Sequence, residues 1–166
     1  MSPDTLDAAN RARVEPATME DLPQLVQLLA DLFEMEGDFE PDPDKQERAL
    51  RLILEHPKRG RIFVLRNDDT EIGMVNLLFT ISTAAGGMVI VLEDFIIHPA
   101  HRHQGYGTIL IDAVRDFARA KDFKRITLLT DKVSEESQRF FSKHGFQSSH
   151  MIPMRMQLDA SSEPER

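Results

Sequence analysis

The most specific segment of this chain reads MVIVLEDFII (88–97), HPAHRHQGYG (98–107) and TILIDAVRDFARAKDF (108–123). Its first part is an apolar strand pattern, its second holds two glycines two residues apart, and its third repeats apolar residues at helical spacing. A strand, a tight turn and a helix start leave several backbone N–H groups directed at one point, with the positive end of the helix dipole behind them. The segment therefore predicts a binding site for an anionic group.

The length of the chain indicates a single domain. Its 166 residues are enough to bury about two-thirds of the unfolded surface in one core. We expect this domain over residues 12–159, with the polar ends 1–11 and 160–166 as flexible tails. No apolar run approaches the roughly 20 residues that span a bilayer, and the start lacks a signal peptide. These features predict a cytoplasmic protein without a membrane partner.

The charge and the cysteine content limit the chemistry. A formal net charge of -8 argues against nucleic acid as a partner, because a polyanion would be repelled. The same charge favours a cationic small molecule or peptide. The chain has no cysteine, which excludes disulfides and a covalent cysteine intermediate.

Apolar periodicity and turn signals predict the order of the elements along the chain. Thr18 and Asp21 have capping-box spacing ahead of a helix, whose apolar pattern ends before an acidic break from Glu34. Asp42, followed by proline, predicts the N-cap of a second helix, and Ser134 predicts the N-cap of a short helix near the C-terminus. The expected strands cover residues 12–16, 61–66, 71–82, 88–97, 125–130, 146 onward and 152–158, and the expected helices begin near residues 19, 43, 106 and 135. This order predicts an α/β (α+β) fold with a mixed sheet and helices on both faces.

The glycine turn matches a family motif. Residues 102–107, RHQGYG, fit the pattern Arg/Gln-x-x-Gly-x-Gly/Ala and resemble the acetyl-CoA pyrophosphate loop of the GNAT superfamily of N-acetyltransferases. The resemblance implies a GNAT-like, mostly antiparallel central sheet and acetyl-CoA as co-substrate. It implies that Arg102 lies at the loop entrance and that the pyrophosphate is held by backbone N–H groups of His103, Gln104, Gly105, Tyr106, Gly107 and Thr108. The alternative is that the two glycines only permit a tight connection.

Two acidic residues interrupt the apolar strand. Glu93 and Asp94 are adjacent, so their side chains point to opposite faces unless a bulge intervenes. Either acid could instead be paired in a salt bridge or emerge at a sheet edge. The string LEDF (92–95) is similar to the acid-bearing strand of small-amine acetyltransferases, which implies Glu93 as general base and Asp94 as an amine-orienting group. The same resemblance implies that the backbone of Phe95, Ile96 and Ile97 aligns the pantetheine arm and polarises the thioester carbonyl.

A second specific segment covers residues 130–146 and resembles the cofactor-flanking helix of the family. It departs from the family pattern twice, with Ser134 where asparagine is common and Phe141 where the family has a tyrosine general acid. Phenylalanine cannot protonate a leaving thiolate, although a thiol of pKa near 8.5 is already a good leaving group. Ser137 offers a nearby hydroxyl. We therefore add Ser134, Ser137 and Phe141 to the predicted cofactor contacts without assigning a general acid.

Two further groups of residues have two interpretations each. Glu34 and Glu36 belong to an acidic segment that is either a solvated loop or, as the family resemblance implies, a border of the acceptor site that attracts a cation. His98, His101 and His103 could suggest zinc. However, they lack the spacing of helical metal ligands and an evident fourth ligand, so no metal is predicted.

The sequence therefore favours an N-acetyltransferase that moves acetyl from acetyl-CoA to a primary amine, on a small or peptide acceptor, by direct attack in a ternary complex. One alternative is a non-catalytic module that binds acetyl-CoA without turning it over. Another is a nucleotide or phosphate binder that uses the same turn. The oligomeric state stays open, with a homodimer among the alternatives.

Overall fold

The computed structural model describes residues 11–36, 42–130 and 134–159. The chain divides into two compact units, Met1–Leu129 and Thr130–Arg166. Within the described residues, no helix is long and apolar enough to cross a lipid bilayer.

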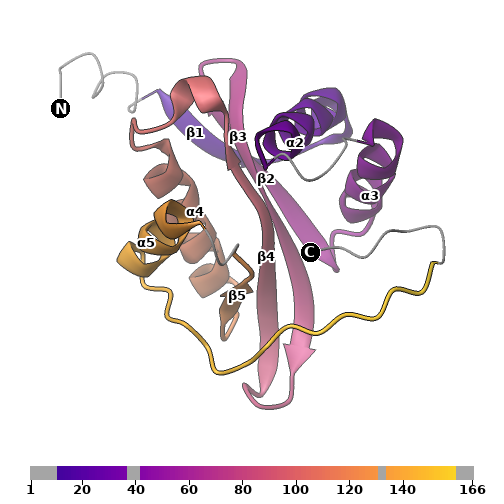
Figure 1. The fold of residues 1–166 in the computed structure, drawn as a ribbon, viewed down its shortest axis with the longest axis vertical. Helices are drawn as coiled ribbons and strands as arrows, with labels where there is room; N and C mark the ends of the chain where they lie inside the picture. The colour runs from indigo at the N-terminus through magenta and orange to yellow at the C-terminus, as the bar shows by residue number, and fades with distance from the viewer. Residues whose placement is uncertain (1–10, 37–41, 131–133, 160–166) are drawn as a thin grey trace. The chain divides into compact units, whose positions relative to one another are not determined.

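The first unit is built on a five-stranded sheet in the order β1-β2-β3-β4-β5 (Figure 1). Its strands are β1 (Ala12–Pro16), β2 (Gly60–Asn67), β3 (Thr70–Ser82), β4 (Gly87–Ile97) and β5 (Ile126–Leu128). The first four strands pair antiparallel, whereas β5 runs parallel to β4 and is shorter than the expected strand 125–130. The prediction of a mixed, mostly antiparallel sheet is confirmed.

The helices of this unit begin at the predicted caps. Its helical elements are η1 (Met19–Asp21), α2 (Leu22–Glu36), α3 (Pro43–Glu55), η2 (Pro99–His101) and α4 (Tyr106–Ala120). The Thr18 amide donates to Asp21 Oδ2 at 2.8 Å, and the Lys45 amide donates to Asp42 Oδ1 at 3.2 Å. These bonds satisfy amides that a helix start leaves without partners. Because α2 continues to Glu36, Glu34 lies in a helix rather than in the expected loop.

The helices cover both faces of the sheet, with α2 and α3 on one face and α4 on the other (Figure 1). Successive strand residues point to opposite faces. Accordingly, Ile62 joins the apolar cluster under α2 and α3, while the next residue, Phe63, contacts Phe117 of α4 with ring centroids 5.1 Å apart. All apolar residues of β2 and most of those of β3 are therefore buried, so the sheet forms the centre of the unit.

The second unit contains helix α5 (Glu135–Lys143). Ser134 is its N-cap, as predicted, and its Oγ accepts from the Ser137 amide at 3.4 Å. The predicted strands from 146 onward and over 152–158 are wrong, because residues 146–159 form no strand. Their apolar side chains at positions 151, 152, 154, 156 and 158 are 81–92% exposed. An alternating pattern makes a strand only where a second backbone completes its hydrogen bonds, and Pro153 lacks one donor.

Candidate functional site

The glycine turn connects β4 to α4 in the predicted way. Gly105 is the N-cap of α4 and has a φ of 87°, and His103 also lies in the left-handed region with a φ of 60°. The Ile109 amide donates to the Gly105 carbonyl at 3.3 Å, so the amides of Tyr106 and Gly107 precede the first intrahelical bond. Consecutive backbone amides of this kind can form an anion-binding site at the positive end of the helix dipole.

The space next to Gly105 fits a bound group. An ideal Cβ at this position would meet nothing within 4 Å, so the turn is open on that side. A side chain would be strained there by the positive φ and would project into the open space. The turn is therefore open to an anionic group on that side, and the roles of residues 103–108 in holding a pyrophosphate stay a prediction.

Side chains near the loop entrance stabilise the turn. Arg102 donates from Nε to the carbonyl of Ile97, the last residue of β4, at 3.1 Å. Gln104 donates from Nε2 to the Ala100 carbonyl at 3.4 Å. In this arrangement the Arg102 side chain fixes the loop to the strand, as a residue at the entrance of the loop can do without touching a phosphate.

Tyr106 has a role that sequence reasoning missed. Its side chain is only 2% exposed, and its hydroxyl accepts from Asn67 Nδ2 at 3.1 Å. The bond joins the start of α4 to the end of β2. The tyrosine side chain is therefore part of the framework, and only its backbone amide remains for a ligand. No sequence signal joins these two residues, which are 39 positions apart.

A bulge in β4 resolves the question of the two acids. Glu93 lies opposite Asn76 and Ile96 lies opposite Met74, so two residues of β4, Asp94 and the next, share the space opposite a single residue of β3. Asp94 has a φ of 52°. Its Oδ2 accepts from Asn76 Nδ2 at 2.6 Å, which brings the carboxylate to the face that Asn76 occupies. Both acids therefore serve one face, the face covered by α2 and α3.

The environment of Asp94 is apolar with one polar partner. Burial raises the pKa of the Asp94 carboxyl, and the hydrogen bond from Asn76 partly opposes this rise. Glu93, in contrast, is exposed. Asn76 is 3% exposed and was missed from the sequence, although an asparagine inside the apolar run 72–79 was a signal that could have drawn attention to it.

The other predicted site residues lie on β4, on α2 and in the second unit. The Ile96 side chain is buried in the cluster under α2 and α3, so only its backbone is available to a ligand, and Phe95 and Ile97 are half-buried. Glu34 is exposed on α2, and the side chain of Glu36 lies outside the described residues. In the second unit, Ser134 caps α5, Ser137 supplies the amide to that cap, and Phe141 packs against Phe140 and Phe146.

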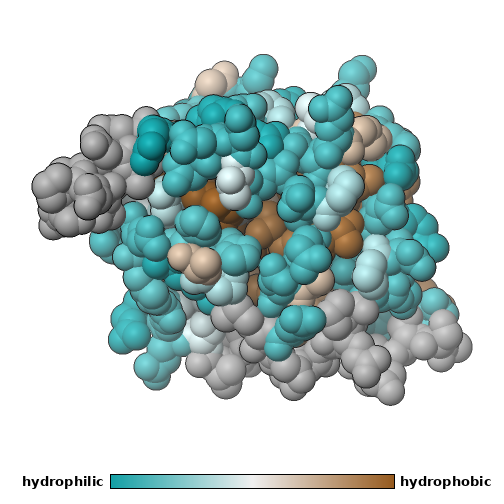
Figure 2. Space-filling model, turned by 90° about the horizontal axis from the view of Figure 1, so that it is seen from above, coloured by the Kyte–Doolittle hydropathy of each residue, from teal (hydrophilic) through white to brown (hydrophobic). Residues whose placement is uncertain are grey.

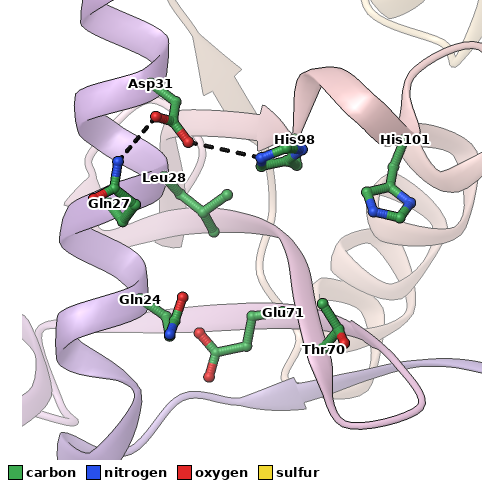
Figure 3. A pocket seen from close by; sticks show the side chains of 8 residues that line it. All are labelled: Gln24, Gln27, Leu28, Asp31, Thr70, Glu71, His98 and His101. Atoms are coloured by element: carbon green, nitrogen blue, oxygen red, sulfur yellow. Dashed lines mark hydrogen bonds and ion pairs between the residues drawn. The ribbon is translucent and has the colours of Figure 1, made fainter.

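A small polar pocket of about 240 Å³ lies on the α2 side of the sheet, near the end of β4 (Figure 3). Its lining residues are Gln24, Gln27, Leu28, Asp31, Thr70, Glu71, His98 and His101. The His98 ring faces Asp31 with Nε2 and Oδ2 3.8 Å apart. Among the described residues, no group of three or more histidines and carboxylates could hold a metal ion.

A buried ion cluster lies beside this pocket. Arg66 donates to Asp21 and to Glu71, each at 2.7 Å, and the Glu71 side chain is only 8% exposed. Burial, together with the adjacent Asp21 carboxylate, raises the pKa of Glu71 to about 7, against the opposing effect of Arg66. The cluster joins the residues just before α2 to the β2–β3 hairpin, and no sequence pattern predicted a buried charge there.

The sequence model of the acetyltransferase (GNAT) family matches residues 22–146, three-quarters of the chain. This chain belongs to the GNAT acetyltransferase family. Members of the family use acetyl-CoA, and the match includes β4, the glycine turn and α4. A search of curated proteins found no match.

Solved structures support the fold of this GNAT chain. A transcriptional regulator from Bacillus halodurans C-125 has a TM-score of 0.77 and 28% identity, over 89% of this chain and 99% of that one. A possible acetyltransferase from Clostridium difficile 630 has a TM-score of 0.82 at 13% identity, over 89% and 98%. The aminoglycoside acetyltransferase meta-AAC0020, from an uncultured soil metagenomic sample and in complex with sisomicin, has a TM-score of 0.75 at 21% identity, over 91% and 99%. The last two similarities concern the fold alone.

Proposed function

We propose that this protein transfers the acetyl group of acetyl-CoA to a primary amine, on a small cationic acceptor or a peptide, within one ternary complex in the cytoplasm. Membership in the GNAT family supports an acyltransferase. The observation that carries the finer proposal is the bulge in β4, because it turns Asp94 to the face on which Glu93 lies opposite Asn76.

The glycine turn and β4 bind the co-substrate in this proposal. Acetyl-CoA supplies the acetyl group as a thioester: the amine nitrogen bonds to the acetyl carbon, the C–S bond breaks, and CoA leaves as a thiolate that takes a proton from solvent. Amides around Gly105 hold its pyrophosphate, and the backbone of residues 95–97 aligns the pantetheine arm. An N–H group of this strand polarises the thioester carbonyl as a fixed dipole, which stabilises the charge that develops on oxygen during attack.

The two acids prepare the amine. An alkyl amine with a pKa near 10.4 is almost fully protonated at pH 7, and its deprotonation there costs about 4.6 kcal/mol. Asp94 accepts a hydrogen bond from the amine and orients it, while Glu93 takes its proton. Because Glu93 is exposed, the proton can leave to solvent, directly or through one water molecule.

The acceptor class follows from charge. The chain carries a net charge of -8, and hydrophilic residues dominate the face shown in Figure 2, around a smaller group of hydrophobic ones. A net negative charge attracts cations and repels polyanions. Polyamines, amino sugars, aminoglycosides, amino acid derivatives and peptide amines are the acceptors to test. Aminoglycosides are included because meta-AAC0020 was solved with sisomicin.

The test is thiol release from acetyl-CoA across this panel of amines. We expect release above the rate without amine for at least one acceptor. A thermal shift series with CoA and ATP should show stabilisation by CoA at concentrations where ATP has little effect. Stabilisation by CoA without thiol release for any amine would contradict catalysis. It would favour the alternative of a module that binds acetyl-CoA without turning it over, which Phe141 at the position of the family's tyrosine supports. Equal stabilisation by CoA and ATP would indicate a general phosphate binder.

A further inference from the structure

Asn76 is an unusual residue for its position in the sheet. It lies in the middle of β3, between Val75 and Leu77, which are fully buried, and is itself 3% exposed. A primary amide at such a position is unfavourable unless its polar atoms are bonded. Its Nδ2 is bonded to Asp94, but its Oδ1 is buried without a hydrogen-bond partner among the described residues. Packing alone would be served better by an apolar side chain.

Asp94 lies in the left-handed backbone region at the bulge. A φ of 52° is disfavoured for a residue with a side chain, and such a conformation persists only where the surrounding structure holds it. The 2.6 Å bond from Asn76 is the hydrogen bond that the structure gives this carboxylate. The buried amide of β3 and the carboxylate at the bulge of β4 are thus each other's partners.

We propose that Asn76 is a positioning residue for the acceptor amine. Asn76 donates to Oδ2 of Asp94 and so directs Oδ1 of the same carboxylate to the N–H groups of the amine. This inference rests on the proposed function, because it assigns the residue that aims Asp94 in that site. Within the described residues only Oδ2 of Asp94 has a partner, so one oxygen remains for an incoming donor.

The choice of an amide rather than a cation has a physical consequence. A lysine or arginine at position 76 would also orient Asp94, but it would neutralise the carboxylate and compete with a cationic acceptor. Asn76 orients Asp94 without supplying charge, and Asp94 forms no ion pair in the described part of the chain. The nearest acid in the register is Glu93, opposite Asn76, and the α2 side of the sheet also carries Asp31, which faces His98 in the pocket. Asn76 therefore adds no positive charge that would compete with an ammonium group for Asp94.

The test is the substitution Asn76→Leu, which removes the donor and the unpartnered oxygen while keeping a side chain of similar size. With the best acceptor of the panel, we expect KM for the amine to rise about tenfold or more, kcat to stay within about threefold, and affinity for CoA to stay unchanged. Asn76→Ser keeps a donor and should recover part of the lost affinity. In the background of Asp94→Asn, Asn76→Leu should cause no further loss, because both changes remove one interaction.

A second measurement does not depend on activity. A carboxyl NMR titration of the free protein should show a higher pKa for Asp94 in Asn76→Leu than in the wild type, because the ionised form loses its donor. An unchanged titration would overturn the proposal. An active wild type whose KM is insensitive to Asn76→Leu would overturn it while the proposed function stands. A wild type that acetylates no amine would overturn both. An Asn76→Leu variant with lower CoA affinity, lower kcat and higher KM for the amine would overturn the positioning role and show that Asn76 is structural.

Discussion

The glycine turn of residues 102–107 and the bulge of β4 are neighbours along the chain but are built in different ways. The turn presents backbone amides at the start of α4, and its geometry depends on glycine spacing and a helix cap. The bulge presents carboxylates, and its geometry depends on the register of β4 against β3. A site made of backbone groups is encoded locally, whereas a site made of side chains requires a second strand to position them.

The two regions also differ in their expected roles, cofactor binding for the turn and reaction with the amine for the bulge. Side chains around the turn are used for support, since Arg102 is bonded to the Ile97 carbonyl and Tyr106 to Asn67. At the bulge, Asp94 and Asn76 are bonded to each other. We therefore expect changes at the turn to alter affinity for CoA, and changes at the bulge to alter turnover or affinity for the amine.

The largest effect is expected for Glu93→Gln. Loss of the general base should lower kcat by about 10²- to 10⁴-fold, because no side chain then removes the proton from the ammonium group of the acceptor. CoA affinity, measured by calorimetry, should stay within about twofold, since the turn is unchanged. An equal loss of turnover and of CoA affinity would mean that the carboxylate is structural and would remove the contrast between the two regions.

Gly105→Val comes next and addresses the turn. A branched side chain would project into the open space beside the amides, so CoA affinity should fall by about a hundredfold or more. Gly86→Val is the matched control, because Gly86 also has a positive φ, 73°, with nothing within 4 Å of an ideal Cβ. Both variants should lose a similar amount of stability, on the order of 1 kcal/mol from the disfavoured φ. Retained CoA affinity in Gly105→Val would refute the binding role of the turn.

A smaller effect is expected for Tyr106→Phe. It removes the hydroxyl that accepts from Asn67 Nδ2, at a cost of about 0.5–1.5 kcal/mol, which should lower the Tm by a few degrees. CoA affinity should change less than threefold, because the amide of residue 106 is retained. A large loss of affinity with little change in Tm would show that the side chain, and not only the backbone, contributes to binding.

The smallest effect concerns Glu71. Its raised pKa means that the folded protein holds the proton more tightly than the unfolded chain, so this contribution to stability is present below about pH 4.5 and lost as the pH rises towards 7. Glu71→Gln should therefore flatten the decline of Tm between pH 5 and 7.5. Glu47→Gln, which alters an exposed ion pair with Arg51, is the control and should keep the slope of the wild type. Identical slopes in wild type and Glu71→Gln would show that this carboxyl titrates normally.

Features of the fold that depend on nearby residues could be predicted from the sequence. The cap of α3 at Asp42, the capping box of Thr18 and Asp21, and the cap of α5 at Ser134 all follow from residues within four positions of each other. The expected C-terminal strands failed for the opposite reason. Their alternation of apolar residues was real, but a strand exists only with a partner, and a single segment of sequence does not contain one.

Within the site, the same limit applies. The amino-acid sequence alone was enough to recognise the family, the two acids in β4, and the succession of a strand, a glycine turn and a helix. Apolar spacing and glycine positions act over a few residues, so these features can be read locally. The pairing of Asn76 with Asp94 joins residues 18 apart, that of Asn67 with Tyr106 joins residues 39 apart, and that of Arg66 with Asp21 joins residues 45 apart. Only the folded sheet decides which of these side chains meet, because register and bulges set the face to which each one points.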